Sequence, residues 1–173
     1  ALLLIIDAQE KLLKNIKNSF EIKKNIKKSV NFANIMGVPI FLTEQYPKGL
    51  GLTDSIILNA LQEFKKIEKN SFSVFSDGEF KKELSKSKKK QIIISGLETH
   101  ICVLQSAIEL KENNFDVFVL VDCTGSIYTK NHKQGIERLS QNNINLINTE
   151  MFIFELLRNS KHEKFKELSK LVK

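Results

Sequence analysis

The chain has 173 residues, a length that fits one domain, because domains typically have about 100–200 residues. Hydrophobic residues make up 42% and charged residues 27%, which is ordinary globular usage and excludes intrinsic disorder. Two cysteines are too few for a disulfide framework, and the longest apolar run, residues 1–6, is far shorter than the ~20 residues of a membrane span. We therefore expect one soluble, cytoplasmic domain over residues 1–173, with no membrane partner.

The net charge is +7, from 27 Lys and Arg against 20 Asp and Glu. Many of the lysines lie in residues 11–28 and 81–90. Only two of the basic residues are arginines, the side chain best suited to bidentate phosphate contacts, and the aromatic residues do not alternate with the lysines as a stacking surface requires. The sequence therefore favours solvated lysine-rich faces and predicts no nucleic-acid partner.

Short apolar runs alternate with longer amphipathic segments along the whole chain. The apolar runs predict strands at residues 2–6, 38–42, 66–68, 91–95, 117–121 and 144–147, the third being the weakest. Helical periodicity predicts helices at 10–36, 80–87, 99–113, 131–142, 151–159 and 162–172. This alternation indicates a single-domain, three-layer α/β/α fold with a mainly parallel, Rossmann-like sheet.

Ligands of parallel α/β sheets bind at the carboxyl ends of the strands. Polar residues follow several predicted strands: Asp7, residues 43–45, residues 96–102 and Asp122. Neither a G-x-G-x-x-G nor a G-x-x-x-x-G-K motif is present, so we expect no nucleotide cofactor. The histidines are 32 and 30 residues apart and the cysteines 21 apart, spacings that do not match a metal motif. We expect no metal.

Cys102 follows the predicted strand at 91–95 by a few residues. If Thr99 is the N-cap of the next helix, Cys102 lies in its first turn, where free N–H groups and the helix dipole lower the pKa of a thiol. That position suits a nucleophile. A buried core cysteine is the alternative, since cysteine is among the most buried residue types, and we expect Cys123 to be one.

Asp7 and Lys69 are the two charged residues that could assist such a thiol. Asp7 directly follows five aliphatic residues, where it could serve a site or cap a helix that begins near Glu10. Lys69 lies in a turn after the weak strand, and an isolated lysine is usually a surface residue. Sequence spacing alone does not bring Asp7, Lys69 and Cys102 together.

The sequence resembles the isochorismatase-like cysteine hydrolase family, in particular its small members that lack the nicotinamidase metal site. The resemblance covers nearly the full chain, and its most specific part is G-x-E-T-H-x-C-V over residues 96–103, together with the upstream D-x-Q and K-x-x-F-S. The matching segments are Leu4-Ile5-Ile6-Asp7-Ala8-Gln9, Leu42-Thr43-Glu44-Gln45-Tyr46-Pro47-Lys48-Gly49-Leu50-Gly51, Lys69-Asn70-Ser71-Phe72-Ser73 and Ser95-Gly96-Leu97-Glu98-Thr99-His100-Ile101-Cys102-Val103-Leu104-Gln105.

The resemblance implies the isochorismatase-like hydrolase fold, homo-oligomers of two or more subunits, and an Asp7-Lys69-Cys102 triad. Asp7 would take the proton of Cys102, and Lys69 would hold both anions in place. The family pattern also implies a cis peptide bond entering Glu98, with the backbone N–H groups of Glu98 and Cys102 forming an oxyanion hole.

The implied function is hydrolysis of an amide-like or ester-like carbonyl of a small molecule through a thioester on Cys102. Gln9, Gln45, Tyr46 and Phe72 are the candidate substrate-binding residues, with Phe72 as an apolar wall. The residues at 43–47 include no histidine, which disfavours the metal-dependent nicotinamidase pattern. Two alternatives remain open: a nicotinamidase-like amidase, and a non-catalytic oligomeric scaffold or basic nucleic-acid-binding protein of the same fold.

Overall fold

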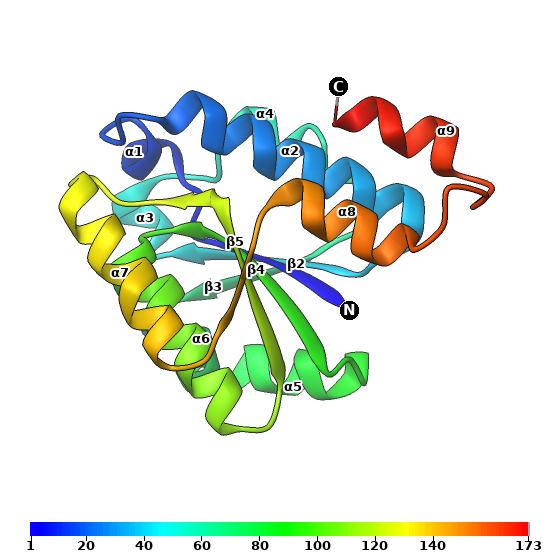
Figure 1. Cartoon of the computed structure of the whole chain (residues 1–173). Helices are drawn as coiled ribbons and strands as arrows, with labels where there is room; N and C mark the ends of the chain where they lie inside the picture. Colours follow the sequence, from blue (N-terminus) through cyan, green and yellow to red (C-terminus); the bar gives the residue numbers. More distant parts are fainter. Residues whose placement is uncertain (173) are drawn as a thin grey trace.

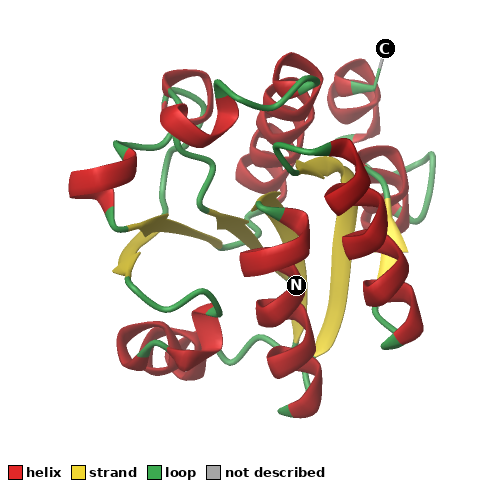
Figure 2. Cartoon of the chain, turned by 90° about the vertical axis from the view of Figure 1, so that its left-hand side faces the viewer, coloured by secondary structure: helices red, strands yellow, loops and turns green. Residues whose placement is uncertain are grey.

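The computed structural model describes residues 1–172. Six strands form one sheet with a layer of helices on each face (Figures 1 and 2). The strands are β1 (Leu2–Ile6), β2 (Ile40–Gln45), β3 (Lys65–Lys69), β4 (Gln91–Leu97), β5 (Asp116–Gly125) and β6 (Asn145–Ile147). The α-helices are α1 (Glu10–Leu13), α2 (Ser19–Met36), α3 (Pro47–Leu50), α4 (Ser55–Leu58), α5 (Gly78–Ser87), α6 (Leu104–Glu112), α7 (Thr129–Gln141), α8 (Thr149–Leu157) and α9 (Phe165–Leu168). All six predicted strands are present.

The strand order is β3-β2-β1-β4-β5-β6, and every neighbouring pair is parallel. This is the doubly wound order in which the chain reverses direction across the sheet at β1 and β4. All five residues of β1 are buried, as expected for an apolar central strand covered on both faces. The predicted Rossmann-like, three-layer α/β/α fold is confirmed, with a sheet that is parallel throughout.

Alternate residues of β1 belong to two hydrophobic cores, one on each face of the sheet. Leu3 and Ile5 of β1 belong to the core under α2, α8 and α9, whereas Leu2, Leu4 and Ile6 belong to the core over α5, α6 and α7. Figure 1 shows these two groups of helices on opposite faces of the sheet. The period of two along β1 therefore joins both helical layers to one strand.

Two helix predictions were wrong in extent. The predicted helix at 10–36 is interrupted at residues 14–18, where Asn18 takes the N-cap position of α2, because asparagine favours such a turn over helix interior. The predicted helix at 162–172 is reduced to α9 and a 3₁₀ turn at Ser169–Leu171. Gly37 ends α2 as its C-cap with a φ of 66°, a left-handed conformation that glycine adopts readily.

A glycine is needed where β4 passes β1. Gly96 has a φ of 113°, and a Cβ atom there would lie 1.9 Å from the carbonyl oxygen of Ile6. The close approach brings the end of β4 against the end of β1, so the residues that follow the two strands share one edge of the sheet. No helix among residues 1–172 has the length and apolar character to cross a membrane.

We predict that Gly96→Ala destabilises the protein by about 3 kcal/mol or more, because the added methyl group collides with backbone in a conformation that alanine rarely adopts. Gly78→Ala is the matched control, since a Cβ at Gly78 meets no atom within 4 Å, and its stability should stay within about 1 kcal/mol of the parent protein. Urea unfolding measures both. A Gly96→Ala protein as stable as the control would contradict this account of the β1–β4 contact.

Candidate active site

The ends of four neighbouring strands converge at one edge of the sheet. Asp7 follows β1, Gln45 ends β2, Lys69 ends β3, and Cys102 lies in the turn after β4. Because the strand order is β3-β2-β1-β4, these residues come from adjacent strands even though Asp7 and Cys102 are far apart in sequence. The strand ends that the sequence pointed to at Asp7, residues 43–45 and residues 96–102 therefore belong to neighbouring strands of this edge.

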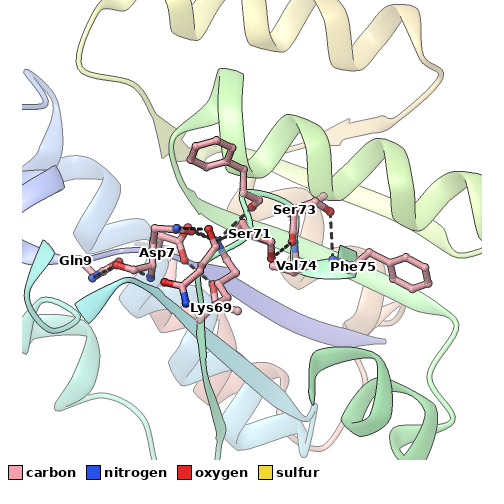
Figure 3. A network of polar contacts seen from close by, with 12 residues as sticks. Asp7, Gln9, Lys69, Ser71, Ser73, Val74 and Phe75 are labelled. Carbon is pink, nitrogen blue, oxygen red and sulfur yellow. Dashed lines mark hydrogen bonds and ion pairs between the residues drawn. The ribbon is translucent and has the colours of Figure 1, made fainter. Parts of the chain in front are cut away.

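Asp7 and Lys69 form a buried ion pair. Lys69 Nζ lies 2.7 Å from Asp7 Oδ2, and both side chains are 0% exposed. The other carboxylate oxygen accepts a hydrogen bond from Thr43 Oγ1 at 2.7 Å. Figure 3 shows Asp7 and Lys69 turned toward each other. The helix-cap alternative for Asp7 was wrong, because Gln9 holds the N-cap position of α1, and the surface alternative for Lys69 was wrong as well.

Three further oxygens surround the Lys69 ammonium. It donates to Gln45 Oε1 at 2.7 Å and to the carbonyl oxygens of Ser71 and Phe72 at 3.1 and 3.2 Å. With Asp7 this makes four acceptors for three N–H hydrogens, so the donor capacity of Lys69 is used within the protein. Lys69 therefore positions and neutralises Asp7 and has no hydrogen left for an additional ligand.

The network continues into the loop after β3. Ser71 Oγ donates to the carbonyl oxygen of Ser73, and Phe75 N–H donates to Ser73 Oγ (Figure 3). Ser73 Oγ also donates to Glu109 of α6 at 2.8 Å. These bonds fasten the loop that supplies two of the four acceptors of Lys69 to α6, the helix that follows the turn with Cys102.

Cys102 lies in a π-helical turn, Thr99–Val103, that precedes α6. The predicted N-cap was wrong: Glu98 holds that position, and Thr99 Oγ1 instead pairs with His132 Nδ1 of α7 at 2.9 Å. The peptide bond between Leu97 and Glu98 is cis, as the resemblance implied. Gly135 of α7 packs against the turn so closely that a Cβ there would lie 3.0 Å from the backbone of His100.

The pKa of Cys102 moves opposite to the sequence prediction. It is raised from 9.0 to about 12, chiefly by burial and also by the charge of the Asp7 carboxylate. Lys69 and a backbone contact with Glu98 act in the lowering direction but are weaker than burial. The helix-terminus argument failed because it ignored desolvation, which disfavours the thiolate. Burial therefore favours the thiol form of Cys102 over the thiolate at neutral pH.

A small cavity of about 100 Å³ brings Asp7 and Cys102 together. Most of its wall is apolar, and its lining residues are Asp7, Leu12, Gln45, Leu50, Phe72, Glu98, Ile101 and Cys102. Lys69 lies behind Asp7 as its ion-pair partner. The cavity can therefore hold a small molecule against a sulfur nucleophile, with a carboxylate available to accept the thiol proton.

The four candidate substrate-binding residues differ in position. Gln45 and Phe72 line the cavity, and Phe72 is 55% exposed, which places it at the mouth. Gln9 and Tyr46 are not among the lining residues. Gln9 is fully buried and clamps the end of β2, because it accepts from Gln45 N–H at 2.8 Å and donates to the carbonyl oxygens of Gln45 and Gly51.

Sequence reasoning missed the apolar wall of the cavity. Leu12, Leu50 and Ile101 line it, and Leu12 and Leu50 come from short helices whose apolar residues do not differ from core residues in sequence. Thr43 was noted among the polar residues at the strand ends but was given no role; it binds Asp7 and pairs with Ile6 in the β1–β2 register. Cys123 is completely buried beside Ser29 and Thr149, as predicted for a core cysteine.

Among residues 1–172, no group of three or more His, Cys, Asp and Glu side chains is arranged to hold a metal ion.

His100 forms hydrogen bonds with Ser126 Oγ at 2.9 Å and with Asn131, and burial lowers the pKa of His132. Glu44 is buried away from the cavity, where it binds Thr53 and Lys66. These groups support the surrounding loops and helices.

The fold and the site define an α/β protein with a cysteine at the carboxyl edge of a doubly wound sheet. The family model for the isochorismatase domain matches residues 1–151. Isochorismatase family protein 1A of Dictyostelium discoideum is 35% identical over 97% of this chain and 84% of its own length. The chain belongs to the isochorismatase family and has its hydrolase fold.

Solved structures agree with this assignment. A Caenorhabditis elegans protein named MAR1 ribonuclease has a TM-score of 0.93 and 34% identity over 99% of this chain and 88% of its own. The YcaC gene product of Escherichia coli, described as an octameric hydrolase of unknown specificity, has a TM-score of 0.92 and 25% identity over 98% of this chain and 85% of its own.

We predict that Asp7→Asn slows alkylation of Cys102 by iodoacetamide about 10-fold to 100-fold at about pH 7, because the thiol loses its proton acceptor. At strongly alkaline pH the difference should disappear, since hydroxide can then remove the proton. Peptide mass spectrometry assigns the label to Cys102, and the buried Cys123 serves as an internal control.

The opposite result would contradict the role given to Asp7. If its charge only opposes thiolate formation, Asp7→Asn lowers the pKa of Cys102 and makes alkylation faster at about pH 7. The melting temperature of the variant shows whether the fold tolerates the change, since Lys69 keeps three other acceptors.

Proposed function

We propose that the protein is a cysteine hydrolase that acts on an amide-like or ester-like carbonyl of a small molecule. The observation that carries this proposal is the apolar cavity that presents Cys102 and Asp7 to the same small volume, with Lys69 pairing the carboxylate from behind. Asp7, Lys69 and Cys102 then act as a base, a positioning cation and a nucleophile.

The first half-reaction forms a thioester. Cys102 Sγ attacks the carbonyl carbon while its proton passes to Asp7, which gives a tetrahedral oxyanion. The backbone N–H groups of Glu98 and Cys102 are the proposed donors to that oxyanion, and the backbone contact of Glu98 with the sulfur supports the first of them. The intermediate collapses as Asp7 returns the proton to the leaving amine or alcohol.

The second half-reaction releases the acid. Asp7, again a carboxylate, removes a proton from water, which attacks the thioester carbonyl. The second oxyanion collapses, the carboxylic acid leaves, and Cys102 recovers its proton from Asp7. Lys69 compensates the charge of Asp7 at every stage at which the carboxylate is ionised.

Gln45 and Phe72 are the predicted substrate-binding residues that the cavity supports. We assign Gln9 a positioning role instead, because it fixes the backbone of Gln45, whose side chain in turn accepts from Lys69. Tyr46 is 55% exposed and is not among the lining residues. Its predicted role in substrate binding stays a prediction, as a contact outside the cavity.

We also infer a homo-oligomer, a cytoplasmic location and a domain that spans residues 1–173. The octameric state described for the Escherichia coli YcaC gene product supports the first inference. The cytoplasmic location rests on the cysteine usage of the sequence. Leu168 supports the third, because it is completely buried in the core under α2 although it lies beyond the matched residues 1–151.

RNA cleavage is a second candidate, favoured by the name of the Caenorhabditis elegans relative and by the net charge of +7. The cavity argues against RNA cleavage, because none of its lining residues is basic and could bind a backbone phosphate. Incubation of the protein and its Cys102→Ser variant with single-stranded RNA distinguishes the two functions. Cleavage that persists in Cys102→Ser would favour a ribonuclease that does not use the sulfur.

We predict that the protein releases a carboxylic acid from members of a panel of small amides and esters, and that Cys102→Ser lowers the rate on the order of 10³-fold or more. Cys123→Ser is the control, since that cysteine is buried outside the cavity, and its rate should stay within a few-fold of the parent. Proton NMR of the products measures turnover. Equal rates for the parent and Cys102→Ser would contradict the proposal.

A further inference from the structure

Most of the wall of the cavity is made of hydrocarbon. Leu12, Leu50 and Ile101 supply aliphatic groups, and Phe72 adds an aromatic ring at the mouth. The three aliphatic residues come from α1, α3 and the π-helical turn, so three separate segments contribute them. An apolar surface of this kind gains free energy when an apolar group displaces water from it.

The lining of the cavity has no basic side chain that could bind an anionic ligand. Its lining residues include two acidic residues, Asp7 and Glu98, and no lysine, arginine or histidine. Lys69, the cation paired with Asp7, has a side chain that is 0% exposed and already has four oxygen acceptors. A substrate carboxylate placed among the lining residues would lose hydration and meet no basic side chain there, which costs free energy.

The volume limits the size of the bound group. The volume of the cavity is about 100 Å³. A known apolar cavity that binds benzene has about 150 Å³. The cavity therefore accommodates a short chain better than an aromatic ring such as a pyridine.

We propose that the acyl group of the substrate is short, uncharged and aliphatic, and that Leu12, Leu50 and Ile101 set its length. This inference rests on the proposed function and narrows it to one substrate class. The acyl chain lies among these three residues, the carbonyl carbon lies at Cys102, and the leaving group points past Phe72 toward solvent. Substrates with an acyl carboxylate or ring are excluded.

The charge selection can be tested without turnover. Iodoacetamide and iodoacetate have similar sizes and differ in charge, and both label a reactive thiol. The ratio of their rates at Cys102, divided by the same ratio for glutathione, should be about 100 or more in favour of the neutral reagent. A normalised ratio within about threefold of one would overturn the claim that the cavity rejects anions.

The length selection needs turnover of a series of amides: acetamide, butyramide, hexanamide, benzamide and succinamate. Acetamide and butyramide should be hydrolysed fastest, and Leu50→Ala should raise the rate of hexanamide relative to butyramide about 10-fold. Leu52→Ala is the matched control, because Leu52 is 57% exposed and outside the lining, and it should leave the preference unchanged.

Three outcomes separate this inference from the proposed function. Fast hydrolysis of succinamate or benzamide would overturn the inference and leave the hydrolase intact. An unchanged chain-length preference in Leu50→Ala would overturn the role of that residue. If no amide or corresponding ethyl ester is hydrolysed while Cys102 still selects the neutral reagent, the hydrolase proposal fails and the cavity retains its charge selectivity.

Discussion

Two opposite charges are buried at the carboxyl edge of this sheet, and each requires the other. Asp7 and Lys69 have no exposed side-chain surface, and an isolated ion in such a place would cost several kcal/mol. Their contact requires that β1 and β3 end at the same level on either side of β2. From β2, Thr43 donates a hydrogen bond to Asp7, and Gln45 accepts one from Lys69. Removing one partner leaves the other charge uncompensated, so the pair ties the fold of three strands to the chemistry of the site.

The position of Cys102 depends on β4, the strand next to β1 at the same edge of the sheet. Gly96 lets β4 approach β1, and the π-helical turn after it brings the sulfur to the cavity that Asp7 also lines. Burial favours the neutral thiol there. In the proposed mechanism, the Asp7–Lys69 pair holds the charge, and the sulfur becomes an anion only as its proton is transferred to Asp7.

The sequence predicted the strands and the candidate site residues best where a polar residue directly follows an apolar run. Five consecutive aliphatic residues identified β1, and the polar residues after it and after β4 pointed to Asp7 and Cys102. Lys69 was not distinguishable from the many other lysines by composition or spacing, and its assignment needed the family resemblance. Its burial arises from the strand order, which no local pattern encodes.

Other features depend on how elements pack in three dimensions. The wall formed by Leu12, Leu50 and Ile101 combines apolar residues that look like ordinary core residues in sequence. The pKa of Cys102 was predicted in the wrong direction because the degree of burial was unknown. Thr99 was expected to cap its own helix, but the neighbouring α7 provides a partner, His132, that sequence separation hides.

The ionisation state of Cys102 in the resting protein tests the central claim most directly. The measurement is the ultraviolet absorbance of the thiolate, followed from about pH 6 to about pH 10, as the difference between the parent protein and Cys102→Ser. With the pKa of Cys102 raised to about 12, the account predicts no thiolate signal near neutrality and only the beginning of a rise at the alkaline limit. A complete thiolate step below about pH 8 would show a preformed anion and contradict the assignment of Asp7 as the group that removes the proton.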